Sequence, residues 1–338
     1  MTSVVILNWN GVNYLRRFLP ALIEHTTHPE VEIVVADNAS VDDSLHFLHT
    51  EYPKIKTIGL DKNYGFAGGY NKALKQLKSE YYVLLNSDVE VTPGWLDTLS
   101  EQMKAHPEIA ACQPKIRSYD RKGCFEHAGA SGGFIDRYGY PFCRGRIFDT
   151  TEEDRGQYDD KTEVFWATGA CLMIRADKFW EVDGFDEAFF AHMEEIDLCW
   201  RLQNKGYKIF CFPESCVYHV GGGTLDAGNS YKTFLNFRNN LLMLYKNLHG
   251  TTRTKTLSVR HVFDMTVVFR NLLKGDVQNA KAVLSARREY KKMRKLYDVD
   301  PKSARPSTVL TKNIYPKSIV KAYYLQNKKT FASLIPNR

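Results

Sequence analysis

At residues 82–92 the chain reads Tyr-Val-Leu-Leu-Asn-Ser-Asp-Val-Glu-Val-Thr, an apolar run that ends in a polar triplet. The apolar residues 82–85 suit a strand buried on both faces, as in a parallel sheet. Residues 86–88 then lie at the carboxyl end of that strand, where ligands bind in open α/β sheets. An acidic group there can hold a divalent cation, and the cation can hold a diphosphate. The alternative is a plain turn leading to Pro93-Gly94, and this segment alone leaves both interpretations open.

Strand-like and helix-like segments alternate around this stretch. Buried-strand patterns occur at 3–8, 31–36 and 55–59, and apolar residues at helical spacing follow each of them. This alternation predicts an α/β fold with a mostly parallel central sheet flanked by helices. Further on we expect helices at 95–106, 177–182, 194–205 and 231–248, and strands at 110–116, 165–175, 208–212 and 216–219. The segment 118–163 has weak periodicity, which indicates a partly ordered loop or a small antiparallel insertion that covers a site.

Charge is unevenly distributed along the 338 residues. Residues 251–338 hold 20 Lys and Arg against five Asp and Glu, a net +15, whereas residues 1–250 are net −8. We therefore expect an α/β domain at 1–250 and a basic, mostly helical C-terminal extension at 251–338. The excess of positive charge in the extension predicts that it has an anionic partner. The seven cysteines are scattered and form no Cys-x-x-Cys pair, which favours reduced, buried thiols over a zinc site.

Polar residues cluster at the ends of the predicted strands. Because the carboxyl ends of parallel strands share one edge of a sheet, we expect the clusters to lie together. Asp37 can accept hydrogen bonds from a base or a ribose, but it can equally cap a helix. The clusters are Asn8-Trp9-Asn10, Asp37-Asn38, Asn63 and Asn86-Ser87-Asp88.

A glycine-rich segment, residues 65–71, opens one of the predicted helices. It matches neither the Gly-x-Gly-x-x-Gly dinucleotide fingerprint nor a Walker loop, so it gives little support to an ATP or dinucleotide cradle. Its small residues do allow the start of the helix to approach a ligand closely.

Three carboxylates, Glu194, Glu195 and Asp197, stand at the start of a predicted helix. They can simply complement the helix dipole, and Asp197 can pair with Arg201 four residues on. Aromatic residues flank them, however, and a carboxylate in such a pocket can act as a general base toward an alcohol. His219 follows a predicted strand and precedes the glycines 221–223, so it is either a packed residue or a ligand beside a bound diphosphate.

Together these motifs resemble family 2 glycosyltransferases, the nucleotide-sugar-dependent enzymes of GT-A fold, and in particular their bacterial rhamnosyltransferase-like branch. The resemblance covers residues 3 to about 245 and assigns residues 1–250 to a GT-A catalytic domain. The motifs that carry it are 5–11, 35–40, 63–71, 84–88, 168–170, 184–187, Glu194-Glu195-x-Asp197-Leu198-Cys199-Trp200-Arg201 and His219-x-x-Gly222.

The resemblance implies a role for each motif. Asp37 would bind the nucleoside, and Asp88 with His219 would hold a divalent cation, Mg²⁺ or Mn²⁺, at the family's Asp-x-Asp position, here 86–88. The donor pocket would comprise Asn8, Asn10, Asp37, Asn38, Asn63, Phe66, Gly68, Asn71, Asn86, Ser87 and Asp88. Trp166, Thr168 and Gly169 would border the acceptor. All of these are expectations from the family likeness.

The catalytic base is the least settled of the implied roles. Family members commonly carry Glu-Asp at 194–195, with the second residue as the base, whereas this chain has Glu195 there. The choice among Glu194, Glu195 and Asp197 therefore stays open. The implied mechanism is a single inverting displacement, in which Glu195 takes a proton from the acceptor hydroxyl. Two departures from the family pattern, Asn86 in place of a carboxylate and Glu195 in place of Asp, leave open a second hypothesis, a non-catalytic nucleotide- or glycan-binding protein of the same fold.

The branch likeness also suggests substrates and a location. The expected donor is a dTDP- or UDP-linked sugar, with rhamnose as the first choice, and the expected acceptor is a glycan or a polyprenyl-linked sugar in cell-surface polysaccharide synthesis. No signal peptide or membrane-spanning stretch is visible, which favours the cytoplasm and the inner face of the membrane. The basic extension suits an anionic membrane surface, or else it packs on the catalytic domain. Nucleic acid is disfavoured by the acidic front and the lack of recognition motifs.

Overall fold

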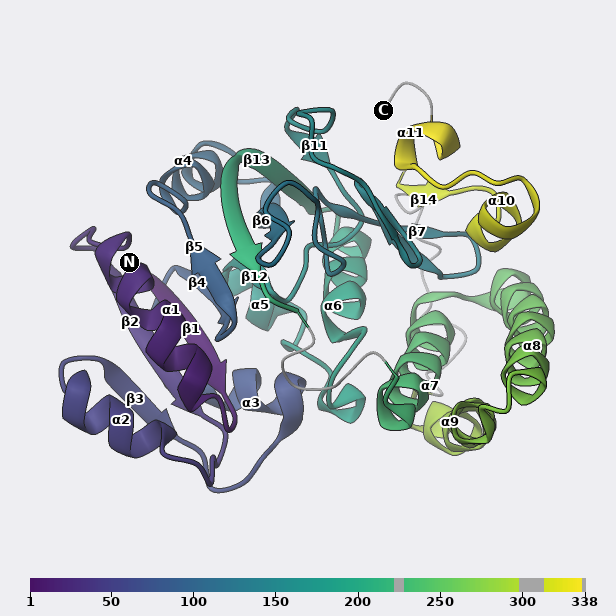
Figure 1. The fold of residues 1–338 in the computed structure, drawn as a ribbon, viewed down its shortest axis with the longest axis horizontal. Helices are drawn as coiled ribbons and strands as arrows, with labels where there is room; N and C mark the ends of the chain where they lie inside the picture. Colours follow the sequence, from purple (N-terminus) through teal and green to yellow (C-terminus); the bar gives the residue numbers. More distant parts are fainter. Residues whose placement is uncertain (222–227, 298–312, 336–338) are drawn as a thin grey trace.

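The computed structural model describes residues 1–221, 228–297 and 313–335. Its first part alternates strands and helices, as the sequence pattern predicts (Figure 1). The elements are β1 (Thr2–Asn8), α1 (Val12–Glu24), β2 (Val31–Asp37), α2 (Ser44–Glu51), β3 (Lys56–Gly59), α3 (Gly65–Leu74) and β4 (Tyr81–Asn86).

A nine-stranded mixed sheet forms the centre of the molecule. Its order is β11-β13-β6-β12-β4-β1-β2-β3, and β5 pairs with β13 off this path. Strands β4, β1, β2 and β3 are parallel, whereas β12 lies antiparallel between β4 and β6. The remaining elements of this part are β5 (Val89–Val91), α4 (Asp97–Ala105), β6 (Ile109–Ser118), β11 (Thr162–Glu163), β12 (Cys171–Arg175), α5 (Ala176–Glu181), η1 (Glu187–Phe189), α6 (Glu194–Asn204) and β13 (Lys208–His219).

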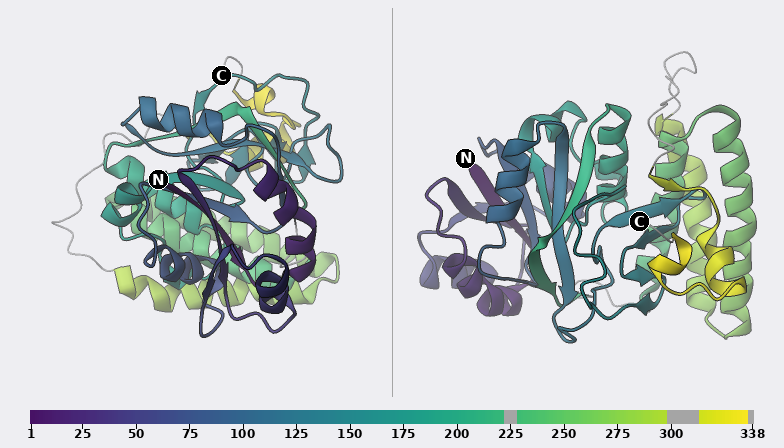
Figure 2. Two further views of the ribbon diagram at one scale, coloured as in Figure 1. Left: turned by 90° about the vertical axis from the view of Figure 1, so that its left-hand side faces the viewer. Right: turned by 90° about the horizontal axis from the view of Figure 1, so that it is seen from above.

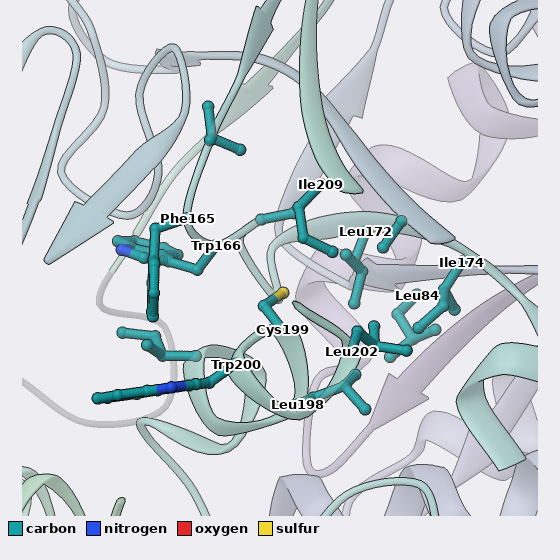
Figure 3. Packing of buried hydrophobic residues seen from close by; sticks show 14 of the residues in the cluster. Leu84, Phe165, Trp166, Leu172, Ile174, Leu198, Cys199, Trp200, Leu202 and Ile209 are labelled. Atoms are coloured by element: carbon teal, nitrogen blue, oxygen red, sulfur yellow. The ribbon is translucent and has the colours of Figure 1, made fainter. Parts of the chain in front are cut away.

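Both faces of the central strands are buried, which explains their unbroken apolar sequences. Val4 and Val83 pack in one hydrophobic core, while the next residues, Val5 and Leu84, pack in the other. Figure 3 shows Leu84 with Leu172 and Ile174 on the strands, next to Leu198 and Leu202 of α6. This packing fixes α6, and hence the carboxylates at its start, against the sheet.

Residues 133–151, within the segment 118–163, supply four strands of a second, five-stranded sheet. Its order is β10-β9-β8-β7-β14, so the small antiparallel insertion, rather than a loop, is the correct alternative for this segment. The last strand comes from the C-terminal part of the chain and pairs parallel with β7. The elements are β7 (Gly133–Asp136), β8 (Pro141–Cys143), β9 (Arg146–Ile147), β10 (Thr150–Thr151) and β14 (Ile314–Tyr315).

The C-terminal extension packs against the rest of the protein. Figures 1 and 2 place α7, α8 and α9 together beside the five-stranded sheet, at the end of the molecule away from α1 and α2. Phe331 lies 5.2 Å from Phe134 and 6.0 Å from Phe142, ring centroid to ring centroid, so the hydrophobic core crosses residue 250. Helix α7 (Ser230–Asn247) precedes the extension, whose helices are α8 (Gly250–Leu273), α9 (Val277–Met293), η2 (Arg294–Tyr297), α10 (Ile319–Leu325) and α11 (Phe331–Leu334).

Several boundaries differ from the sequence-based expectation. The segments 208–212 and 216–219 form one strand, β13, because a register shift between Phe212 and Cys216 keeps both halves paired with β6. The strand expected at 165–175 begins only at Cys171. All seven cysteines are free, and five of them are buried. Among the helices of residues 1–221, 228–297 and 313–335, none has the length and apolar character needed to cross a bilayer.

Candidate active site

Four parallel strands, β4, β1, β2 and β3, end together at one edge of the central sheet. Asn8 is opposite Asp37, Asp37 is opposite Gly59, and Leu7 is opposite Asn86. The polar residues at these ends therefore share one rim, as the predicted topology requires.

Asp37 is buried, and both carboxylate oxygens accept hydrogen bonds. Oδ1 accepts from Asn8 Nδ2 at 3.0 Å, and Oδ2 accepts from the backbone N–H of Ser40 at 2.9 Å. Helix α2 begins only at Ser44, with Asp43 at its N-cap, so the helix-cap interpretation of Asp37 is wrong. The Asp37 carboxylate instead fixes the turn that follows β2.

The loops after β1 and β2 are tied to each other. Asn10 donates its backbone N–H to Ser40 Oγ at 2.9 Å, and its side-chain Oδ1 accepts from the N–H of Val41 at 2.8 Å. Asn10 has a φ of 52°, in the left-handed region that Asn tolerates better than most residues. The two loops therefore form one rigid wall of the rim.

Asn38 connects this wall to the start of α3. Its Nδ2 donates to Asn63 Oδ1 at 3.1 Å and to the carbonyl oxygen of Gly65 at 3.0 Å, while its Oδ1 accepts from the N–H of Tyr64 at 3.0 Å. Gly65 has a φ of +70°, and a Cβ there would lie 2.5 Å from the Phe190 ring. The glycine-rich segment thus allows contact with the loop before α6.

Phe66, Gly68 and Asn71 all lie on α3, but they face other parts of the protein. The Phe66 ring packs on Phe185, and a Cβ at Gly68 would lie 3.7 Å from Glu187 Oε2. Asn71 donates to the carbonyl oxygen of Phe185 at 2.8 Å and accepts from the N–H of the same residue at 3.0 Å. The amide of Asn71 therefore holds the turn before η1.

The residues expected to border the acceptor are buried at the start of β12. Trp166 donates its indole N–H to the carbonyl oxygen of Phe134 at 3.0 Å. Thr168 Oγ1 accepts from the N–H of Ala170 at 3.2 Å, and a Cβ at Gly169 would lie 2.9 Å from the Phe66 ring. These polar atoms have protein partners, and Gly169 provides the close approach of β12 to α3.

Asp88, His219 and Glu126 form a buried row of charges. His219 Nε2 lies 3.1 Å from Asp88 Oδ1, and His219 Nδ1 lies 3.2 Å from Glu126 Oε2, although this second contact is poorly aligned for a hydrogen bond. Asn86 Nδ2 is 3.5 Å from His219 Nε2. Ser87 lies in the turn between β4 and β5. The row forms because His219 on β13 is opposite Val89 on β5.

Electrostatic interactions within the row favour the charged forms of Asp88, His219 and Glu126. Burial disfavours the imidazolium form, but the two carboxylates outweigh burial and raise the pKa of His219 to about 10. Burial would raise the pKa of Asp88, yet the adjacent His219 lowers it below its ordinary value. Glu126 shows the same balance, and its pKa is also lowered.

Asp88 and His219 carry donor atoms of the kind that bind divalent cations, but His219 binds a cation only in its neutral form. Asp88 Oδ1 and His219 Nε2 lie 3.1 Å apart, within hydrogen-bond distance, so a bound cation would replace the proton between them. Metal-binding histidines usually pair their other ring nitrogen with a carboxylate, the position that Glu126 occupies. Within the described ranges, however, no three or more His, Cys, Asp or Glu side chains converge as a ready metal site.

The three carboxylates of α6 have different environments. Asp197 is fully buried, and its oxygens accept from Arg201 Nε at 2.7 Å, Lys246 Nζ at 2.9 Å and Asn247 Nδ2 at 2.8 Å. These partners outweigh burial and lower its pKa. Asp197 is therefore a structural anchor between α6 and α7.

Glu194 and Glu195 lack such partners. In each, Oε2 is enclosed and has no hydrogen-bond partner in the part of the chain that the structure describes. Burial raises the pKa of Glu194 well above its ordinary value, and the nearby Glu195 adds to the rise. Burial also raises the pKa of Glu195, to about 7, while backbone N–H groups at the helix start limit the rise. Glu195 is thus the carboxylate that ionises near neutral pH.

The start of α6 belongs to the same framework as the strand ends. The N–H of Ala67 on α3 donates to the carbonyl oxygen of Phe190 at 3.1 Å, just before α6. Asn38 holds the start of α3, as described above, and the N–H of Asn86 donates to the carbonyl oxygen of Ala170 at 3.0 Å. Hydrogen bonds and close contacts therefore link the elements that carry Asp37, Asp88 and Glu195.

A family model for "Glycosyl transferase family 2" matches residues 3–183, more than half of the chain. The chain belongs to this family. The matched residues include the four strand ends and the Asp88 turn, whereas α6 and His219 lie beyond them.

Relatives and solved structures agree with the family. N-acetylglucosaminyl-diphospho-decaprenol L-rhamnosyltransferase from Mycobacterium tuberculosis is 28% identical over 232 residues, covering 64% of this chain and 75% of that protein. The crystal structure of GalNAc-T7 with UDP, GalNAc and Mn²⁺ has a TM-score of 0.57 and 17% identity, covering 73% of this chain and 48% of that one. The mannosyltransferase PcManGT from Pyrobaculum calidifontis, in complex with GDP-Man and Mn²⁺, has a TM-score of 0.52 and 12% identity, covering 88% of each chain. The structural similarities establish the GT-A fold of this family 2 glycosyltransferase.

The sequence analysis missed the residues that shape the loop before Glu194. Phe190, His192 and Met193 have φ values of 65°, 69° and 73°, an unfavourable conformation for residues other than glycine. Asn239 on α7 holds this loop, because its Nδ2 lies within 2.7–2.9 Å of the carbonyl oxygens of Phe189, Ala191 and His192. No local motif marks Asn239, since its partners are about 50 residues away.

We predict that Asn239→Ala lowers kcat of this glycosyltransferase about 10- to 100-fold with little change in the donor KM, because a misplaced base costs rate rather than donor binding. Steady-state kinetics against both substrates measure the split. Asn236→Ala is the matched control, because Asn236 Nδ2 donates to the carbonyl oxygen of Lys232 at 2.8 Å, within α7 itself. Equal kcat values for the two variants would remove Asn239 from the positioning of the base.

Proposed function

We propose that this family 2 glycosyltransferase moves a sugar, with rhamnose as the first choice, from a dTDP- or UDP-linked donor to a hydroxyl of a glycan or a polyprenyl-linked acceptor. The observation that carries this proposal is the half-buried Glu195 carboxylate, with one oxygen unpartnered and a pKa near 7, in the framework that also holds Asp37 and Asp88. The name of the Mycobacterium relative supports a rhamnosyl donor and a diphospho-polyprenol acceptor.

The proposed reaction is one inverting displacement. Asp37 and the loop residues Asn8, Asn10 and Asn38 position the nucleoside end of the donor. Glu195 accepts the proton of the acceptor hydroxyl as its oxygen attacks the anomeric carbon, and the bond to the nucleoside diphosphate breaks on the opposite face. Asp88 and His219 would hold the divalent cation, which when bound neutralises charge on the departing diphosphate. Mn²⁺ in complexes of the two fold neighbours supports this assignment.

The proposed location follows from the acceptor. A polyprenyl-linked acceptor lies in the membrane, so we place the enzyme on the inner face of the cell membrane, with its basic extension toward the anionic surface. The net charge of +15 on residues 251–338 supports this orientation.

The donor is tested by thermal unfolding with a panel of nucleoside diphosphates, with and without Mn²⁺. We expect dTDP or UDP with Mn²⁺ to raise Tm by a few degrees at saturating concentration, and purine diphosphates to raise it much less. Transfer of labelled rhamnose from the preferred nucleotide to a polyprenyl-diphosphate acceptor then tests the reaction. Nucleotide binding without transfer or donor hydrolysis would favour the non-catalytic alternative.

A further inference from the structure

An open groove of about 600 Å³ lies on the helical extension, outside the site described above. The end of α7, the first half of α8 and the last half of α9 form its walls. Five basic side chains line it, and no carboxylate is among the lining residues: Arg253, His261, Arg287, Lys291 and Arg294.

Most of this positive charge is not neutralised by the protein. Arg287 pairs with the buried Asp264. In contrast, Arg253, Lys291 and Arg294 form no ion pair with any carboxylate of residues 1–221, 228–297 and 313–335. Several cations in one concave surface attract a multiply charged anion, and guanidinium groups match the oxygen geometry of phosphate.

Two of the three guanidinium groups in the groove lie over the ring of one tyrosine. Arg253 stacks on the Tyr245 ring with its guanidinium carbon 4.3 Å from the ring centroid, and Arg294 lies 5.9 Å from the same centroid. Tyr290 packs edge-on against Tyr245 at 6.1 Å, which supports the ring from below. The arginines are thus partly ordered before any ligand binds, which lowers the entropic cost of binding.

Helix α8, which forms one wall of the groove, also carries an exposed apolar ridge. Val262, Phe269 and Leu273 are 60%, 64% and 72% exposed. Their spacing of seven and four residues places them on one helix face, roughly a third of a turn from the groove residues Leu257 and His261. Exposed apolar side chains beside cations are typical of a surface that enters the boundary of a lipid bilayer.

We propose that the groove binds the phosphate group of a membrane lipid, while the ridge of Val262, Phe269 and Leu273 contacts the lipid chains. This inference rests on the proposed membrane-side function and names the part of the extension that performs it. Phospholipids, polyprenyl diphosphates and soluble phosphates all carry phosphate groups that the groove can bind. The apolar ridge favours those phosphates that are attached to lipid chains.

The test uses the full chain and two double variants. Lys291→Glu/Arg294→Glu reverses the groove charge, and Phe269→Ser/Leu273→Ser removes the ridge. In co-sedimentation, we expect wild type to bind phosphatidylcholine vesicles that contain phosphatidylglycerol, and each variant to bind them at least tenfold more weakly, because cations and apolar contacts both contribute to such binding. Isothermal titration with inorganic diphosphate separates the two effects, since only the groove variant should lose that binding.

The matched control is Lys54→Glu/Lys78→Glu, which makes the same charge change at exposed positions of the α/β part. We expect this control to bind the vesicles like wild type. Equal vesicle binding by the groove variant and the control would overturn the proposal, as would wild-type binding of inorganic diphosphate without any vesicle binding. The Tm shift caused by a nucleoside diphosphate and Mn²⁺ is measured in every variant, so that failure of the donor site is seen separately from failure of the groove.

Discussion

Glu195→Gln should abolish sugar transfer while leaving donor binding intact. Gln keeps the size of the side chain and fits the same half-buried position, but it cannot accept a proton from the acceptor hydroxyl. General-base catalysis typically contributes about 10²–10⁴-fold, so we expect kcat to fall by that factor. The donor Kd, measured by thermal shift or titration calorimetry, should change by less than about threefold.

The pH dependence of kcat tests the role of Glu195 independently. Because burial raises the pKa of Glu195 to about 7, the proton-accepting carboxylate form is lost as pH falls through that value. We therefore expect kcat of the wild type to rise with pH up to about 7 and then to level off. The residual activity of the Gln variant should lack this rise with pH.

Glu194→Gln is the control that separates the two neighbouring carboxylates. Burial and the neighbouring Glu195 raise the pKa of Glu194 well above its ordinary value, which disfavours its ionised, proton-accepting form. Its amide variant should keep most of the activity. Full turnover in Glu195→Gln together with loss in Glu194→Gln would exchange the proposed roles. Asp197 is a poor candidate, because Arg201, Lys246 and Asn247 already occupy its oxygens.

Sequence reasoning succeeded where local pattern and sheet topology act together. Asn8, Asp37 and Asn86 meet at one edge because each ends a parallel strand, and the apolar runs before them mark those strands. The fold class follows from the same alternation of strands and helices. These features depend on short-range patterns, which a single sequence displays directly.

Other parts of the site depend on pairings that no local pattern encodes. Glu126 meets His219 across 93 positions of sequence, and it lies in a segment without clear periodicity. Asn71 was expected at the donor, but its amide is engaged by the backbone of Phe185, 114 residues away. Likewise, β14 has only two residues and pairs with a strand 179 residues earlier in the chain. Tertiary contacts decide such cases, and the residue types alone do not.

Asp88→Ala should remove the effect of divalent cations on the enzyme. Asp88 is the only carboxylate of the 86–88 motif, and its oxygen lies 3.1 Å from His219 Nε2. Without it, the remaining row consists of His219 and Glu126, which pair with each other. We expect donor hydrolysis and transfer to fall at least about 100-fold, because a cation at the leaving diphosphate stabilises several kcal/mol of developing charge.

The measurement that isolates this role is the Mn²⁺-dependent part of donor binding. In wild type, Mn²⁺ should strengthen nucleoside diphosphate binding, and in Asp88→Ala the nucleotide should bind equally with and without the cation. Because the Ala variant leaves His219 with one carboxylate instead of two, Asp88→Asn provides a second variant of nearly native shape that lacks the charge. If Asp88→Asn retained both the Mn²⁺ enhancement and wild-type transfer, the cation would have to bind elsewhere, and the carboxyl end of β4 would only shape the rim.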